Sequence, residues 1–189
     1  MKSQLKEFLP GKLFEKAKEA LKKSDLTEAQ KKKAIKKIAE VFNIPNNLIK
    51  KGLRSYQKPK HRLDLIKHKS GAFILDDTYN SNPEALISTL KYFNNIAGKN
   101  NKVVVLGDML ELGEIEEREH KRVALEIKKH NYQKVIGVGH LVRFITSNVY
   151  KTAFEVLPEI KKYLKPKTYI LFKGSRSIGL DKLVDDIIK

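Results

Sequence analysis

Short β-branched runs that alternate with helical patterns are the feature that most constrains the fold of this 189-residue chain. Strands are expected near Leu63–Lys67, Ala72–Asp76, Lys102–Leu106, Lys134–Val138 and Thr168–Phe172, with a short edge strand at Ala153–Val156. Helices are expected near Pro83–Ile96, Ile115–His130, Leu141–Ser147, Pro158–Leu164 and Ile178–Ile188. A strand followed by a helical crossover favours a parallel neighbour strand. The pattern therefore predicts an α/β fold, with a mostly parallel sheet and helices on both faces.

The first 58 residues have a different pattern, which is helical throughout. A helix is expected over Gln4–Lys23, and Thr27 with Gln30 is expected to form a capping box for a helix that continues to Phe42. A short helix follows at Asn46–Lys51, and residues 56–62 form a linker. We therefore predict two parts, a helical segment at 1–58 and an α/β domain at 59–189.

The most informative local motif is Asp-Asp-Thr-Tyr-Asn-Ser-Asn-Pro at residues 76–83. It joins an apolar strand to a helix, with Asn82 suited to the N-cap and Pro83 to the first helical position. Such strand–loop–helix elements often bind a nucleotide or another anion in α/β proteins. An ordinary β-to-α connection has the same composition, so this motif alone leaves both interpretations open.

Two further strands end in polar loops. Gly107–Glu114 follows the Lys102–Leu106 strand, and Lys-Gly-Ser-Arg-Ser follows the strand that ends at Phe172. In an open parallel sheet the ligand lies outside the carboxyl ends of the strands. Solvated loop charge explains any one of these loops but explains all three less well. The sequence thus predicts a binding site to which three strands deliver Asp76 and Asp77, Asp108 and Glu111, and Lys173, Ser175 and Arg176.

At these residues the chain resembles a known family. The octapeptide, then Leu-Gly-Asp-Met-Leu-Glu-Leu-Gly-Glu, then Lys-Gly-Ser-Arg-Ser are similar, in this order and spacing, to the C-terminal domain of MurF-type Mur ligases. Arg62 and His120 also match the pattern, and the resemblance extends weakly over residues 1–59, as the end of a central domain. It implies a Rossmann-like α/β fold and ATP-driven amide formation, in which a carboxylate of UDP-MurNAc-tripeptide is phosphorylated and attacked by the amine of D-Ala-D-Ala. The Tyr79–Asn82 loop favours this D-alanyl-D-alanine-adding type over sister ligases.

The resemblance also implies roles for residues. Arg62, Asp77, Tyr79 and Asn80 would hold the adenosine end of ATP. Lys173, Ser175 and Arg176 would hold the dipeptide carboxylate or the nascent acyl group, and Asp108 would form a wall of the substrate cleft. No catalytic residue and no metal ligand is assigned, and His120 is expected to support the site from the core.

A phosphate-binding P-loop is absent from the sequence. Its two Gly-Lys pairs, Gly11-Lys12 and Gly98-Lys99, are followed by Leu13 and Asn100, so neither supplies a hydroxyl for Mg²⁺ or a glycine-rich cradle. Mg²⁺ would therefore come through a central domain that the sequence lacks. Three accounts remain open: a split-ligase subunit whose partner carries the P-loop, a truncated chain, or a binding module without catalysis.

Charge and composition limit the other classes of protein to which the chain could belong. The net charge is +17, and residues 1–60 hold 17 Lys and Arg against 6 Asp and Glu. This excess makes a basic nucleic-acid-binding α/β protein the alternative function. The lysine cluster at 31–37 lacks arginine and interleaved aromatic residues, so we interpret it as a solvated helix face and expect no specific nucleic-acid binding. The chain has no cysteine, no secretory signal and no apolar run long enough for a membrane helix, a composition that fits a cytoplasmic protein.

Overall fold

The computed structural model describes residues 27, 30, 33–34, 36–37, 45–54 and 58–189. The chain divides into two compact units, Met1–Pro59 and Lys60–Lys189. In the first unit the backbone N–H of Thr27 donates to Gln30 Oε1 at 2.9 Å, and the N–H of Gln30 donates to Thr27 Oγ1 at 3.3 Å, so the predicted capping box is confirmed. Helix α3 spans Asn46–Arg54, three residues beyond its expected end. The helix expected at Gln4–Lys23 lies outside the described residues, and the origin of 1–58 in a central domain stays a prediction.

The second unit is built on a six-stranded sheet in the order β1-β2-β6-β3-β4-β5. The strands are β1 (Asp64–Lys67), β2 (Phe73–Asp77), β3 (Asn101–Gly107), β4 (Lys134–Val138), β5 (Val149–Tyr150) and β6 (Thr168–Lys173). β1 pairs with β2 antiparallel, and every other pair is parallel, which confirms the predicted mostly parallel α/β sheet. The chain returns from the β5 edge to insert β6 between β2 and β3, and this places the last strand at the centre of the sheet.

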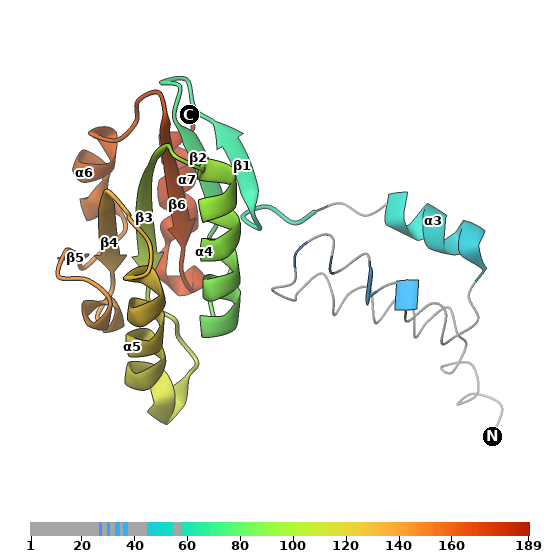
Figure 1. The fold of residues 1–189 in the computed structure, drawn as a ribbon, viewed down its shortest axis with the longest axis horizontal. Helices are drawn as coiled ribbons and strands as arrows, with labels where there is room; N and C mark the ends of the chain where they lie inside the picture. The colour runs from blue at the N-terminus through green and yellow to red at the C-terminus, as the bar shows by residue number, and fades with distance from the viewer. Residues whose placement is uncertain (1–26, 28–29, 31–32, 35, 38–44, 55–57) are drawn as a thin grey trace. The chain divides into compact units, whose positions relative to one another are not determined.

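Helices cover both faces of this sheet (Figure 1). They are α4 (Pro83–Ala97), α5 (Glu116–Ile127), α6 (Leu157–Lys161) and α7 (Leu180–Ile187), with short 3-10 helices η2 (Gly113–Ile115), η3 (Leu141–Phe144), η4 (Phe154–Val156) and η5 (Arg176–Ile178). None of the helices within the described ranges is long and apolar enough to cross a membrane.

Alternation along each strand divides the core into two layers. In β3, Val103 and Val105 join a cluster with residues of α6 and α7, whereas Val104 and Leu106 join a cluster with residues of α4 and α5. Successive side chains of a strand point to opposite faces, so a continuous apolar run is what a strand buried on both faces requires. The α4–α5 layer matters for the site, because the last residues of β2 and β6 continue it.

Helix α4 begins where the sequence predicts. Asn82 Oδ1 accepts a hydrogen bond from the backbone N–H of Ala85 at 2.8 Å, and Pro83 occupies the start of the helix. The cap satisfies one of the N–H groups that lack an intrahelical partner. It also fixes the end of the loop that leaves β2.

Two expected elements differ from the structure. The edge strand expected at Ala153–Val156 is wrong: β5 forms at Val149–Tyr150, and Phe154–Val156 is a 3-10 helix. Ala153, Val156 and Ile160 are buried, and their spacing is that of a helical stripe. The helix expected at Leu141–Ser147 is only the turn Leu141–Phe144, because the Thr146 hydroxyl donates to the Val135 carbonyl and the chain turns back to the sheet.

Candidate functional site

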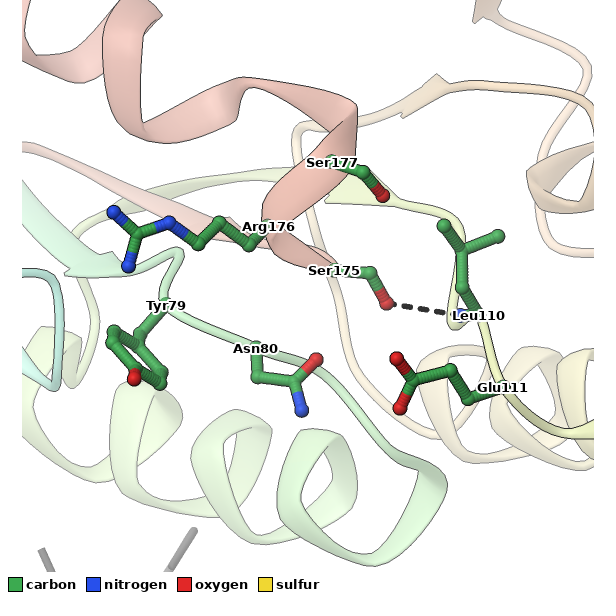
Figure 2. Close-up of a pocket in the computed structure, with 7 residues that line it drawn as sticks. All are labelled: Tyr79, Asn80, Leu110, Glu111, Ser175, Arg176 and Ser177. Atoms are coloured by element: carbon green, nitrogen blue, oxygen red, sulfur yellow. Dashed lines mark hydrogen bonds between the residues drawn. The ribbon is translucent and has the colours of Figure 1, made fainter. Parts of the chain in front are cut away.

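A pocket of about 540 Å³ opens at the carboxyl ends of three adjacent strands, β2, β6 and β3. Loops that follow these strands supply its lining: Tyr79, Asn80, Leu110, Glu111, Ser175, Arg176 and Ser177 (Figure 2). The insertion of β6 between β2 and β3 makes this place a topological switch point, where open α/β sheets bind their ligands. The three polar loops therefore share one site at one edge.

Tyr79 lies at one end of this pocket and has two arginines near its ring. The guanidinium carbon of Arg62 is 3.9 Å from the centre of the ring, and that of Arg176 is 5.3 Å from it. The backbone N–H of Tyr79 donates to the His61 carbonyl at 3.0 Å, which holds the residue in place. Arg62 is buried, whereas Arg176 is exposed. This end of the pocket thus combines an aromatic ring with fixed positive charge.

A buried ion pair lies beneath the Tyr79–Asn80 loop that lines the pocket. Lys173 is 1% exposed, its Nζ lies 2.8 Å from Asp77 Oδ2, and it donates to the Asn80 carbonyl at 2.9 Å. The Asp77 carboxylate also accepts from the Thr89 hydroxyl and from the backbone N–H of Leu63. Asp77 and Lys173 are direct partners in the β2–β6 register and extend the faces of their strands that carry Leu75 and Leu171 into the α4–α5 layer. The pair ties the Tyr79–Asn80 loop to the central strand.

The carboxylate of Asp108 is directed to the turn that follows β4. It accepts from the backbone N–H groups of His140 and Val142, both at 2.8 Å. Gly139 lies beside it with a φ of +117°, and a Cβ there would fall 2.4 Å from Asp108 Oδ2. Only glycine leaves room for this arrangement. Asp108 thus joins the β3 and β4 loops.

Two further contacts fix the loop after β3. The backbone N–H of Leu110 donates to Ser175 Oγ at 2.9 Å, and that of Met109 donates to His120 Nε2 at 3.1 Å. The other ring nitrogen of His120, Nδ1, lies 2.7 Å from the Glu116 carbonyl, which can only accept, so the partners require the neutral tautomer with its proton on Nδ1. His120 is fully buried, and it supports the loop from the core, as expected.

Glu111 sits at the tip of that loop with a φ of +65°, in the left-handed region that favours glycine. Its side chain is exposed, and its carboxylate points into the pocket towards Asn80 (Figure 2). A left-handed conformation at a non-glycine residue costs free energy and is common at functional sites.

Behind the Tyr79 loop, Asp76 is 2% exposed. Its carboxylate accepts from the backbone N–H and hydroxyl of Thr78 and from His61 Nδ1, at 3.1, 2.7 and 2.7 Å. Burial raises the pKa of Asp76 above its ordinary value of 3.8, and the hydrogen bonds from Thr78 and His61 oppose that rise. The cluster braces the backbone from which Tyr79 projects.

The eight predicted binding residues therefore occupy four kinds of position. Tyr79, Asn80, Ser175 and Arg176 line the pocket, Arg62 contacts Tyr79, and Asp77 and Lys173 lie beneath the loop, while Asp108 faces the β4 turn. Whether any of them binds a nucleotide or substrate stays a prediction. The sequence predicts Glu111 at this edge of the sheet without a specific role, and its pattern gives no role to Leu110 or Ser177, although all three stand in the motifs quoted above.

The site residues do not fit a resident metal ion. In the part of the chain that the structure describes, no group of three His, Asp or Glu side chains is placed to hold one. The ring of Tyr79 and the charged side chains of the pocket are instead suited to organic ligands with flat or ionic groups.

Known proteins are similar to this chain in sequence. The curated UDP-N-acetylmuramoyl-tripeptide–D-alanyl-D-alanine ligase of Bacillus subtilis is 32% identical over 159 residues, which cover 78% of this chain and 35% of that enzyme. The enzyme of the same name from Buchnera aphidicola subsp. Baizongia pistaciae is 36% identical over 159 residues, 80% of this chain and 34% of the relative. The chain thus spans about a third of the length of these relatives.

Solved structures agree. MurF from Acinetobacter baumannii matches with a TM-score of 0.67 at 26% identity, over 85% of this chain and 37% of that one. MurF from Thermotoga maritima, solved in complex with ADP, has the same fold, with a TM-score of 0.60 at 22% identity over 70% of this chain and 31% of that one. The family model described as Mur ligase, glutamate ligase domain, matches residues 61–176, so the chain belongs to the Mur ligase family through this C-terminal domain and is similar to its MurF members.

Proposed function

We propose that this chain supplies the C-terminal nucleotide- and substrate-binding domain of an ATP-dependent amide ligase in peptidoglycan precursor synthesis. The ligase adds D-Ala-D-Ala to UDP-MurNAc-tripeptide. The observation that carries the proposal is the pocket formed by loops after β2, β3 and β6, because these loops contain the motifs that resemble MurF-type ligases. Identities of 32% and 36% to two D-alanyl-D-alanine ligases support it.

The Tyr79 end of the pocket is the proposed nucleotide side. Tyr79 offers a flat surface, Asn80 offers an amide with both a donor and an acceptor, and Arg62 adds positive charge. These groups fit a base and a nearby phosphate, and the Thermotoga maritima MurF binds ADP. Asp77 lies below this end, and we assign it and Lys173 mainly to the shape of the loop, because both are buried and paired.

The wall that carries Ser175, Arg176 and Ser177 is the proposed site for the incoming dipeptide or the nascent acyl group, and Arg176 lies beside Tyr79, where the two proposed sites meet. An arginine guanidinium matches a carboxylate with two parallel hydrogen bonds, and the hydroxyls of Ser175 and Ser177 line the same wall. Bound ATP would supply the activating phosphoryl group. The residues of this chain would orient the substrates and exclude water when the site closes.

The resemblance implies that a P-loop binds the ATP phosphates while the substrate carboxylate is activated, and these 189 residues lack a P-loop. We propose that the P-loop and the Mg²⁺ site belong to another segment or another chain. Among the described residues, no group of His, Asp and Glu side chains is placed to hold a metal ion. The chain by itself is therefore expected to release no ADP from ATP.

A hybrid enzyme tests the proposal. Residues 60–189 replace the matching C-terminal part of the Bacillus subtilis ligase, and ADP release is measured with UDP-MurNAc-tripeptide and D-Ala-D-Ala together and singly. We expect release that needs both substrates, and none from a control hybrid whose P-loop lysine is replaced. A hybrid that folds cooperatively but forms no amide with D-Ala-D-Ala would support the non-catalytic binding module instead.

A further inference from the structure

Two opposite charges stand in the pocket without neutralising each other. Glu111 lies at one end and Arg176 at the other, with the Asn80 side chain between them (Figure 2). The hydrogen bonds and ion pairs of the described residues include none at the Glu111 carboxylate and none at the Arg176 guanidinium, which lies over the ring of Tyr79. Lys173, in contrast, is paired with the Asp77 carboxylate and the Asn80 carbonyl. The pocket thus presents one anion and one cation to a ligand.

The backbone of Glu111 supports a role in binding. Its left-handed φ of +65° is a conformation that glycine would adopt at no cost, as Gly113 does two residues later with a φ of +59°. Hydrogen bonds from Leu110 to Ser175 and from Met109 to His120 hold the loop on the N-terminal side of this residue. The left-handed conformation of Glu111 therefore costs free energy that a glycine would not, and it is kept at a residue whose carboxylate points into the pocket.

A small zwitterion has the complementary charges. A free dipeptide carries an ammonium group and a carboxylate at the two ends of a backbone about 7 Å long. Charge-assisted hydrogen bonds to both ends would fix its direction as well as its affinity. A ligand whose amine is acylated would leave Glu111 without a partner.

We propose that Glu111 is a specificity-determining residue that binds the ammonium group of the incoming dipeptide, while Arg176 binds its carboxylate. The inference rests on the proposed function and adds a residue and a direction to it. The Glu111 carboxylate would select a free dipeptide over N-blocked peptides, and the amine of the dipeptide would lie at the loop after β3.

The test uses the intact ¹⁵N-labelled chain, and amide shifts of Leu110 and Ser177 report binding. The probes are D-Ala-D-Ala, N-acetyl-D-Ala-D-Ala and D-Ala-D-Ala amide at fixed salt, with wild type, Glu111→Gln and Arg176→Gln. The matched control is Glu114→Gln, since Glu114 is an exposed acid of the same segment that does not line the pocket. Glu111→Asn is a second variant, because asparagine tolerates the left-handed conformation.

We expect Glu111→Gln and Glu111→Asn to weaken D-Ala-D-Ala binding about tenfold or more, as the loss of a charge-assisted hydrogen bond predicts. They should leave the affinity for the N-acetyl dipeptide unchanged, and Arg176→Gln should weaken the free dipeptide but not its amide. Equal affinity of wild type and Glu111→Gln for D-Ala-D-Ala, or of wild type for the free and N-acetyl dipeptides, would overturn the role of Glu111 and leave the hybrid result intact. Absence of dipeptide binding to wild type would also overturn it, and the hybrid assay would then decide the proposed function separately.

Discussion

Lys173 brings a buried ammonium group to the end of the central strand β6. It is 1% exposed and is compensated by the Asp77 carboxylate and the Asn80 carbonyl. Burial of two charges costs desolvation free energy that their attraction only partly offsets, so the pair contributes little net stability. Its contribution lies in position, since it holds the loop that presents Tyr79 and Asn80.

Removal of one partner of this pair should therefore be costly. Lys173→Met leaves the Asp77 carboxylate buried without its cation, and we expect the free energy of unfolding to fall by about 3–5 kcal/mol. The double variant Lys173→Met with Asp77→Leu should recover part of the loss. Urea unfolding measures both, with exposed Lys182→Met as the control, expected within about 0.5 kcal/mol of wild type. A loss no larger than that of the control would contradict the bracing role.

Asp76 should make stability depend on pH in a defined direction. Its raised carboxyl pKa means that the native state binds this proton more tightly than the unfolded state does. The resulting stabilisation is present below the ordinary value of 3.8 and is lost as pH rises through the raised pKa. Asp76→Asn removes this dependence, so its free energy of unfolding relative to wild type should increase as pH rises from about 4 to 7. Urea titrations at several pH values measure it, and a flat or falling difference would show the assignment to be wrong.

At the scale of elements, the sequence predicts the strands better than the turns. The β-branched runs that form β3, β4 and β6 are buried on both faces of the sheet. A strand of this kind can be predicted from its continuous apolar sequence, without knowing which strand pairs with it. The short edge strand Val149–Tyr150 was missed, because two residues carry no periodicity and pair only through β4. The order of strands is likewise a tertiary property, and no local pattern places β6 between β2 and β3.

The site shows the same division. The strand ends predict which loops meet, and Tyr79, Asn80, Ser175 and Arg176 do line one pocket. Residue types alone cannot predict which charges are already satisfied inside the protein. Asp108 and Glu111 are both acids of one loop, yet Asp108 caps the β4 turn while Glu111 faces the pocket.

The connection between β3 and β4 can be tested at Asp108. In Asp108→Asn one carboxylate oxygen becomes an NH₂ group, so one of the N–H groups of His140 and Val142 faces a donor instead of an acceptor. We expect a loss of about 1–3 kcal/mol of stability and faster hydrogen exchange at the Val142 amide. Exposed Asp185→Asn on α7 is the matched control. Unchanged exchange at Val142 would refute the capping role.

At the scale of the whole molecule, charge is distributed unevenly along the chain. Residues 1–60 carry 17 Lys and Arg and 6 Asp and Glu, out of totals of 39 and 22. Uneven positive charge attracts any polyanion, and it raises association rates without conferring a sequence preference. The pocket, in contrast, contains a carboxylate and lies in the second unit. The excess of lysine therefore has an electrostatic consequence that is separate from the proposed ligase function.

That consequence is measurable with DNA. We expect the chain to bind duplex DNA at low salt and to lose that affinity steeply as salt increases, because release of counterions from the phosphates is the only driving force. Between about 50 and 200 mM salt, neutralisation of six or more phosphates would lower the affinity by about a thousandfold or more. Fluorescence anisotropy with two unrelated 20-base-pair duplexes should show equal affinities at each salt concentration. A preference for one duplex that persists at about 0.2 M salt would require direct contacts with base edges. Such a preference would support the nucleic-acid-binding function, because nonspecific contacts between lysines and phosphates cannot produce a sequence preference.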